Sequence, residues 1–106
     1  MNNSNKASCP LTIAIDLDGT WSADPHGFLA FHNLMTSRGH IVIIATGREK
    51  WSEDMERLSL PIGIPIVYCG RDLKEKAVRA DGWSVNIWID DIPGMIQDCR
   101  ILSGSL

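Results

Sequence analysis

The chain has 106 residues, of which 44% are hydrophobic and 22% charged, and this size and composition predict one globular domain. The formal net charge is −3, and the lysines and arginines are scattered, so the basic stripe typical of a nucleic-acid-binding face is not evident. No apolar run approaches the roughly 20 residues that span a bilayer, which argues against a membrane-spanning helix.

The first ten residues, MNNSNKASCP, are polar and lack the apolar centre of a signal peptide. We therefore expect a flexible tail over residues 1–10, a single domain over residues 11–106, and a cytoplasmic protein. Cys9, Cys69 and Cys99 are odd in number and widely spaced, which is typical of reduced thiols rather than of a disulfide framework.

The first predicted elements are a strand and a helix. Leu11–Ile15 is a nearly continuous apolar run rich in β-branched residues, as in parallel strands that are buried on both faces. Between Phe28 and Met35 the apolar residues recur at helical spacing, and Gly39 is a natural end for that helix.

The rest of the chain repeats this alternation of strand and helix. The further predicted strands are Ile41–Ala45, Ile64–Cys69 and Val85–Ile89. The further predicted helices run from Trp51 to Leu58 before Pro61, from Leu73 to Ala80 before Gly82, and from Met95 to Leu102 after Pro93. An order that alternates in this way predicts an α/β fold in which helices cover both faces of a parallel sheet.

Polar residues follow each predicted strand, and the carboxyl ends of parallel strands are where such sheets bind ligands. The first strand leads into Asp16-Leu17-Asp18-Gly19-Thr20, the second into Thr46-Gly47-Arg48, the third into Gly70-Arg71-Asp72 with Lys74 and Lys76 beyond, and the fourth into Asp90-Asp91.

Two pairs of carboxylates, at two strand ends, predict a cation site. Crowded negative charge is unfavourable unless a cation compensates it, and oxygen ligands without Cys or His suit Mg²⁺. The Thr46 hydroxyl, the backbone amides that follow it and a lysine would hold phosphoryl oxygens. Together these groups favour phosphoryl-transfer chemistry, in which positioning and charge neutralisation supply most of the rate.

Each of these residues also has an ordinary structural interpretation. A single Asp after a strand is commonly a turn or N-cap residue, and Lys74 and Lys76 lie on a helix where either is expected to be a surface charge. Arg48 is suited to contact substrate or to pair with a nearby Glu, and Trp21 to shield the site or recognise substrate. The four features in order at four strand ends favour a site.

These motifs resemble those of the haloacid dehalogenase-like superfamily of phosphohydrolases. The D-x-D-G-T motif after a hydrophobic strand matches Asp16–Thr20, the Thr that ends the second strand matches Thr46, and the paired acids that end the fourth strand match Asp90 and Asp91. The family's third motif is a lysine, for which Lys76 is preferred over Lys74. The resemblance spans about residues 11 to 102 and implies a Rossmann-like three-layer α/β/α domain with strand order 3-2-1-4.

The resemblance also implies roles for these residues. Asp16 would attack phosphorus and form an aspartyl-phosphate, and Asp18 would serve as general acid and base. The phosphoryl group would be held by Thr46, Gly47, Arg48, Lys74 and Lys76, with Thr46 and Lys76 counted among the catalytic residues. Mg²⁺ would be held by Asp16, the backbone carbonyl of Asp18, Asp90 and Asp91.

Few residues separate Thr20 from the first helix, or the third strand from the next helix, so both usual sites for a cap domain are empty. The resemblance is therefore to the minimal capless type, which implies an open site, a phosphorylated substrate that includes macromolecules, and a homodimer as one way to cover the site. Two alternatives stay open: a non-catalytic relative that binds phosphate or protein, and a response-regulator-type phospho-acceptor domain. Cys69-Gly70 at the end of the third strand argues against the latter.

Overall fold

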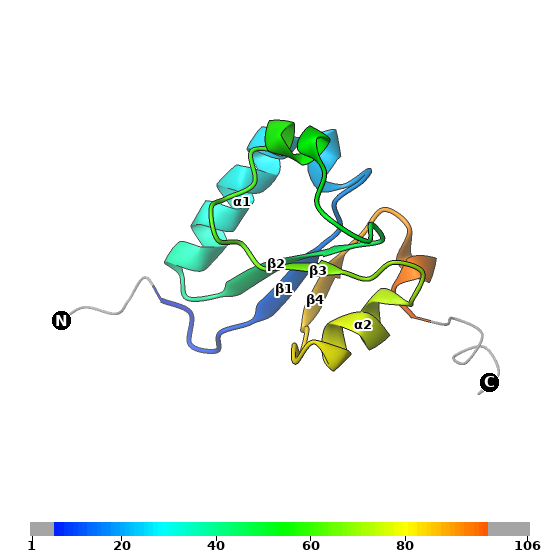
Figure 1. The fold of residues 1–106 in the computed structure, drawn as a ribbon. Helices are drawn as coiled ribbons and strands as arrows, with labels where there is room; N and C mark the ends of the chain where they lie inside the picture. Colours follow the sequence, from blue (N-terminus) through cyan, green and yellow to red (C-terminus); the bar gives the residue numbers. More distant parts are fainter. Residues whose placement is uncertain (1–5, 98–106) are drawn as a thin grey trace.

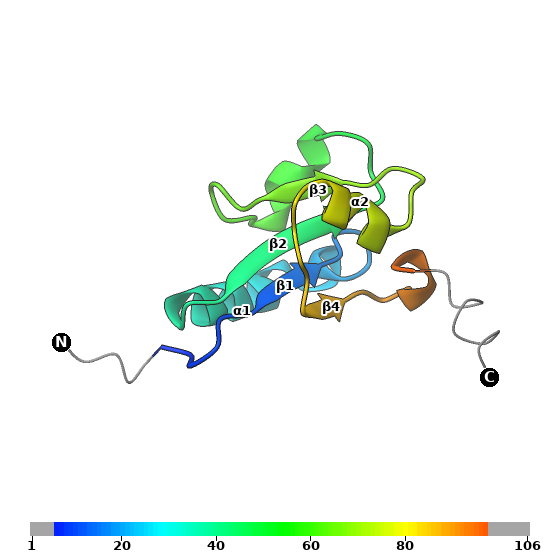
Figure 2. The ribbon, with the colours of Figure 1, turned by 90° about the horizontal axis from the view of Figure 1, so that it is seen from below.

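β-Branched apolar segments form a four-stranded, all-parallel sheet in the computed structural model, which describes residues 6–97. The strand order is β3-β2-β1-β4, as expected (Figure 2). The strands are β1 (Thr12–Ile15), β2 (Ile41–Thr46), β3 (Ile66–Tyr68) and β4 (Ile87–Ile89). In register, Ile13 pairs with Val42 on one side and with Ile87 on the other, so β1 lies between β2 and β4.

The α-helices cover opposite faces of the sheet, which confirms the predicted α/β architecture (Figure 1). Helix α1 (Pro25–Ser37) packs Phe28, Phe31 and Met35 against a core that includes Ile13 and Ile15 on one face. Helix α2 (Lys74–Ala80) packs on the other face. That second core contains Ala14, Ile43, Ala45, Val67, Cys69 and Val78.

The helix predicted from Trp51 to Leu58 is instead a 3-10 helix at Glu53–Leu58. Met55 is its buried residue, whereas Trp51 is 48% exposed, so the segment lacks the apolar stripe that would hold a longer α-helix on the core. Ser59, with φ of 54°, ends the segment in a left-handed turn.

The two ends of the domain agree with the prediction only in part. A single 3-10 turn at Pro93–Met95 begins where the fourth helix was predicted, and Cys99 and Leu102 lie outside the described residues. Of the predicted N-terminal tail, residues 1–5 also lie outside them. Lys6 Nζ donates to Ser37 O at 2.9 Å and Ala7 N–H to Arg38 O at 2.8 Å, so this part of the tail contacts the end of α1.

All four strands run in the same direction, so their carboxyl ends lie at one edge of the sheet. Backbone hydrogen bonds continue the ladder past the strands: Asp16 N–H donates to Ile89 O at 2.9 Å, and Cys69 N–H donates to Thr46 O at 2.7 Å. The loops that follow the strands therefore start from fixed positions. Within residues 6–97, no helix combines the length and apolar character that crossing a membrane requires.

Candidate active site

Asp16 lies at the centre of the carboxyl edge of the sheet. It follows β1, a middle strand, and its residue is only 6% exposed. Asp90 and Asp91 follow the neighbouring strand β4, so the topology brings two sequence-distant acidic segments together. Carboxylate oxygens of Asp16, Asp90 and Asp91 all lie within 4.8 Å of one another.

This donor set fits Mg²⁺, which prefers carboxylate oxygens and usually retains part of its water shell. Asp16 is buried and Asp91 exposed, so the cluster reaches from the interior to the solvent. Burial raises the pKa of Asp16, and a hydrogen bond with Asp16 lowers the pKa of Asp91. A divalent cation would offset the repulsion between these carboxylates.

Thr20 ties the two acidic segments together, a role that the sequence interpretation missed. Its buried Oγ1 lies 3.0 Å from Asp16 Oδ2 and 3.1 Å from Asp91 Oδ1, and it accepts the Asp91 N–H at 3.1 Å. The signal was present, because Thr20 is the last residue of the D-x-D-G-T motif. One hydroxyl group therefore fixes the end of β1 against the end of β4.

Gly19 leaves room for Asp91. Its φ is +89°, in the left-handed region that favours glycine, and a Cβ added there would lie 2.6 Å from Asp91 Oδ2. A side chain at position 19 would therefore push the Asp91 carboxylate out of the cluster.

Lys74, not Lys76, supplies the lysine of the site. Lys74 is 3% exposed, and its Nζ donates to Asp16 Oδ1 at 2.6 Å and to Asp90 Oδ2 at 2.7 Å. Burial lowers the pKa of Lys74, but the hydrogen bonds to Asp16 and Asp90 outweigh it and the net pKa is raised. A charged ammonium group is thus held between two carboxylates.

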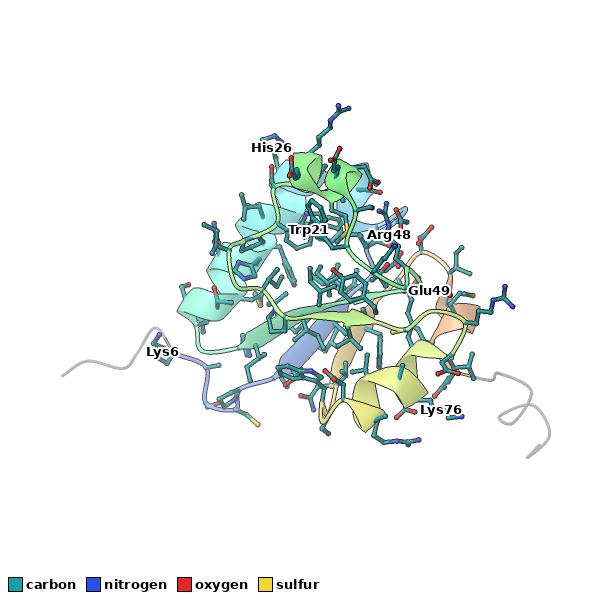
Figure 3. All side chains as sticks on the ribbon, in the orientation of Figure 1. Lys6, Trp21, His26, Arg48, Glu49 and Lys76 are labelled. Carbon is teal, nitrogen blue, oxygen red and sulfur yellow. The ribbon has the colours of Figure 1, made fainter. Side chains whose placement is uncertain are left out.

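The preference for Lys76 was wrong because of the phase of α2. The helix begins at Lys74, and two residues further on a side chain has turned by roughly 200° about the axis. Lys76 is accordingly exposed and does not line the cavity at the strand ends. Figure 3 shows it on α2, well away from Arg48.

Asp18, the predicted acid and base, is held by Arg48. Arg48 Nε and Nη2 donate to its two carboxylate oxygens at 2.8 and 2.7 Å. The hydrogen bond to Arg48 lowers the pKa of Asp18. Arg48 was interpreted as a phosphate ligand, but in this arrangement its guanidinium group joins Asp18 to Asp54. The sequence interpretation did not single out Asp54.

Thr46 lies at the end of β2, where it was expected, but it is fully buried. Its Oγ1 accepts the backbone N–H of Arg48 at 3.1 Å, which shapes the turn after the strand. Gly47 rather than Thr46 reaches the surface of the cavity. Thr46 is therefore buried beneath the cavity, and the backbone at Gly47 lines it.

Most of the predicted residues line an open cavity of about 340 Å³ at the strand ends, but Thr46 and Lys76 do not. Its lining consists of Asp16, Asp18, Gly47, Arg48, Lys74, Asp90, Asp91, Ile92 and Met95. Ile92 and Met95 are 57% and 44% exposed, so one wall is apolar and accessible.

Trp21 does not belong to this cavity, contrary to the interpretation that it shields the site or recognises substrate. It is completely buried, its indole Nε1 donates to Leu58 O at 2.6 Å, and its ring stacks on Phe28 with centroids 5.9 Å apart. Trp21 joins α1 and the 3-10 helix Glu53–Leu58 to the core, where Figure 3 labels it.

Comparisons of the chain with protein-family models, with curated proteins and with solved structures each found no match. The function of the protein must therefore be inferred from the chemistry of this site.

Proposed function

We propose that the protein is a magnesium-dependent phosphatase that hydrolyses phosphomonoesters through an aspartyl-phosphate on Asp16. The observation that carries this proposal is the arrangement around Asp16. A buried carboxylate lies in contact with a buried ammonium group, Lys74, and within 4.8 Å of two further carboxylates, beside an open cavity.

Asp16 is placed to act as a nucleophile toward phosphorus. Its Oδ1 accepts from Lys74 and its Oδ2 lies near Thr20, so the orientation of the carboxylate is set on both sides. Lys74, which contacts Asp16 Oδ1, would neutralise negative charge on the oxygens of the transferring phosphoryl group. In the first step an Asp16 oxygen bonds to phosphorus and the bond to the ester oxygen breaks. The leaving group takes its proton from the protonated form of Asp18, and the pairing with Arg48, which lowers the pKa of Asp18, works against this form.

Asp16, Asp90 and Asp91, together with the backbone carbonyl of Asp18, would hold the Mg²⁺ ion, as the family resemblance implies. When bound, the ion supplies charge neutralisation for the phosphoryl group. The protein's own contribution is to gather these oxygens at one edge, through the pairing of β1 with β4 and through Thr20.

The cavity also bears on the class of substrate. It is open, and its apolar wall at Ile92 and Met95 is accessible to solvent. Such a site accommodates a phosphate group carried on a large molecule, so the proposed substrate class includes phosphorylated macromolecules. The proposed setting of the reaction is the cytoplasm.

The proposal is tested by release of p-nitrophenol from p-nitrophenyl phosphate, with and without Mg²⁺, by wild type and Asp16→Asn. We expect turnover that requires Mg²⁺ and that the substitution abolishes, because the amide cannot form the aspartyl-phosphate. Asp81→Asn is the matched control. Asp81 is an exposed carboxylate that follows α2, so its substitution removes the same charge at a position away from the cavity. Melting temperatures of the three proteins check that they are folded.

Equal activity of wild type and Asp16→Asn would contradict the proposed mechanism. Absence of turnover by the wild type on p-nitrophenyl phosphate, phosphopeptides and phosphosugars would contradict the enzymatic function. If phosphate still bound to the folded protein in that case, the non-catalytic phosphate-binding alternative would replace it.

A further inference from the structure

Arg48 connects the candidate active site to a turn outside it. Its guanidinium group has five N–H donors, and every one has an acceptor. Two go to Asp18, two go to Asp54 at 2.7 and 2.9 Å, and Nη1 also donates to Ser52 Oγ at 2.7 Å. No donor is left for a phosphoryl oxygen while these contacts persist.

Asp54 also makes contacts that do not involve Arg48. Asp54 lies in the 3-10 helix Glu53–Leu58, which is anchored in the core by Met55, and Ser52 Oγ donates to Asp54 Oδ1. On the other side, the Arg48 backbone is held by Thr46 Oγ1 at the end of β2. Arg48 is thus held at its backbone by Thr46 and at one edge of its guanidinium group by Asp54, whose own side chain is 60% exposed.

Asp18 depends on Arg48 for its orientation. The Asp18 side chain is 55% exposed and lies in a loop, and each of its two oxygens accepts one N–H from Arg48. A carboxylate oxygen has two lone-pair directions, so each oxygen retains one for another donor. Paired charge-assisted hydrogen bonds from one guanidinium fix a carboxylate in geometry. An exposed ion pair adds little stability, so orientation is the main effect of this bridge.

We propose that Asp54, acting through Arg48, positions Asp18 for hydrolysis of the aspartyl-phosphate. This inference rests on the proposed phosphatase function. In that step the oxygen of a water molecule bonds to phosphorus, the phosphorus–oxygen bond to Asp16 breaks, and its electron pair returns to the Asp16 carboxylate. The proton of the water passes to Asp18, and inorganic phosphate leaves. Asp54 touches neither substrate nor water and is a positioning residue.

The leaving group of p-nitrophenyl phosphate separates the two steps. p-Nitrophenol is a much stronger acid than an alkyl alcohol, so its departure needs little help from a proton donor. A misplaced Asp18 should therefore leave formation of the aspartyl-phosphate almost unchanged and slow its hydrolysis. The expected signature is a fall in kcat and KM together at constant kcat/KM.

The experiment compares wild type, Asp54→Ala, Arg48→Ala and the double variant, with Mg²⁺, in stopped-flow and steady-state assays. We expect Asp54→Ala to lower kcat about ten-fold, a fraction of the usual contribution of general acid–base catalysis, with a burst approaching one p-nitrophenol per chain. The double variant should be no slower than Arg48→Ala, because Asp54 acts through Arg48. Glu56→Ala is the matched control, since Glu56 is exposed in the same 3-10 helix.

Asp54→Ala behaving like Glu56→Ala would overturn the inference, as would additive losses in the double variant or a fall in kcat/KM without a burst. If the wild type turns over and Asp16→Asn does not, such results remove only this inference. If the wild type fails to turn over, or Asp16→Asn remains active, the proposed function fails and this inference fails with it.

Discussion

Lys74 shows how one residue links stability and chemistry. A buried ammonium group is costly to remove from water unless carboxylates pair with it closely, and Lys74 has two such partners at 2.6 and 2.7 Å. The two carboxylates also lose their hydration, because the side chains of Asp16 and Asp90 are buried, with exposed fractions of 7% and 2%. Such a cluster is a poor way to stabilise a small core, and the proposed phosphoryl transfer would account for its position at the strand ends.

We expect Lys74→Met to lower kcat for p-nitrophenyl phosphate by about 100-fold or more, the usual effect of removing a charge-stabilising donor. It should also lower the free energy of unfolding by about 3–5 kcal/mol, because Asp16 and Asp90 are left without their partner. Steady-state kinetics and urea titrations measure the two effects. Lys76→Met is the control and should change neither quantity; a larger loss in Lys76→Met would contradict the assignment of Lys74.

At the scale of elements, α1 illustrates how local chemistry fixes the ends of a helix. Asp24 is its N-cap and accepts the Gly27 N–H at 3.1 Å, Pro25 occupies the first turn, and Gly39 follows its end with φ of +96°. The segment Glu53–Leu58 has acidic residues in its first turn but makes no side-chain cap hydrogen bond. Met55 is the buried residue of this segment, so little apolar burial is available to hold a longer α-helix on the core.

Asp24→Ala should lower the free energy of unfolding by about 1 kcal/mol, because the Gly27 N–H loses its acceptor at the start of α1. Asp24→Ser keeps an acceptor and should recover most of this loss. Urea titrations of wild type and both variants measure the effect. An unchanged midpoint in Asp24→Ala would mean that water replaces the cap without cost. Phosphatase activity should stay constant, since Asp24 does not line the cavity.

At the scale of the whole molecule, parallel topology concentrates negative charge at one edge. The formal net charge is only −3, yet Asp16, Asp18, Asp90 and Asp91 all line the same cavity. Lys74 and Arg48 compensate this charge in part through direct ion pairs. A bound divalent cation would complete the compensation, and its binding would be linked to folding.

We therefore expect Mg²⁺ to stabilise the native protein. At about 100 times its dissociation constant the ion should raise the free energy of unfolding by about 2.7 kcal/mol. The measurement is a urea titration at matched ionic strength, so that general screening is constant. Asp91→Asn should reduce this gain and Asp81→Asn should keep it. Equal stabilisation of wild type and Asp91→Asn would show that Mg²⁺ acts elsewhere than at the cluster.

The strands, the parallel sheet and the gathering of acids at one edge were predictable from the residue pattern, whereas the strand order 3-2-1-4 was an implication of the family resemblance. Continuous β-branched runs such as Ile41–Ala45 mark buried strands, and alternation with helices makes the strands parallel. Once the strands are parallel, Asp16 and Asp90 must lie at the same end. These inferences need only local pattern and topology.

Only the tertiary structure decided which side chains meet within that edge. The choice between Lys74 and Lys76 depended on the residue at which α2 begins, because each step along a helix turns a side chain by about 100°. The partners of Arg48 depended on the path of the chain, since Asp18 is 30 residues away in sequence. The sequence by itself determined the strands, their parallel arrangement and the edge at which the acids gather, because these need only local patterns. Helix phase and long-range packing determined which charged groups come into contact.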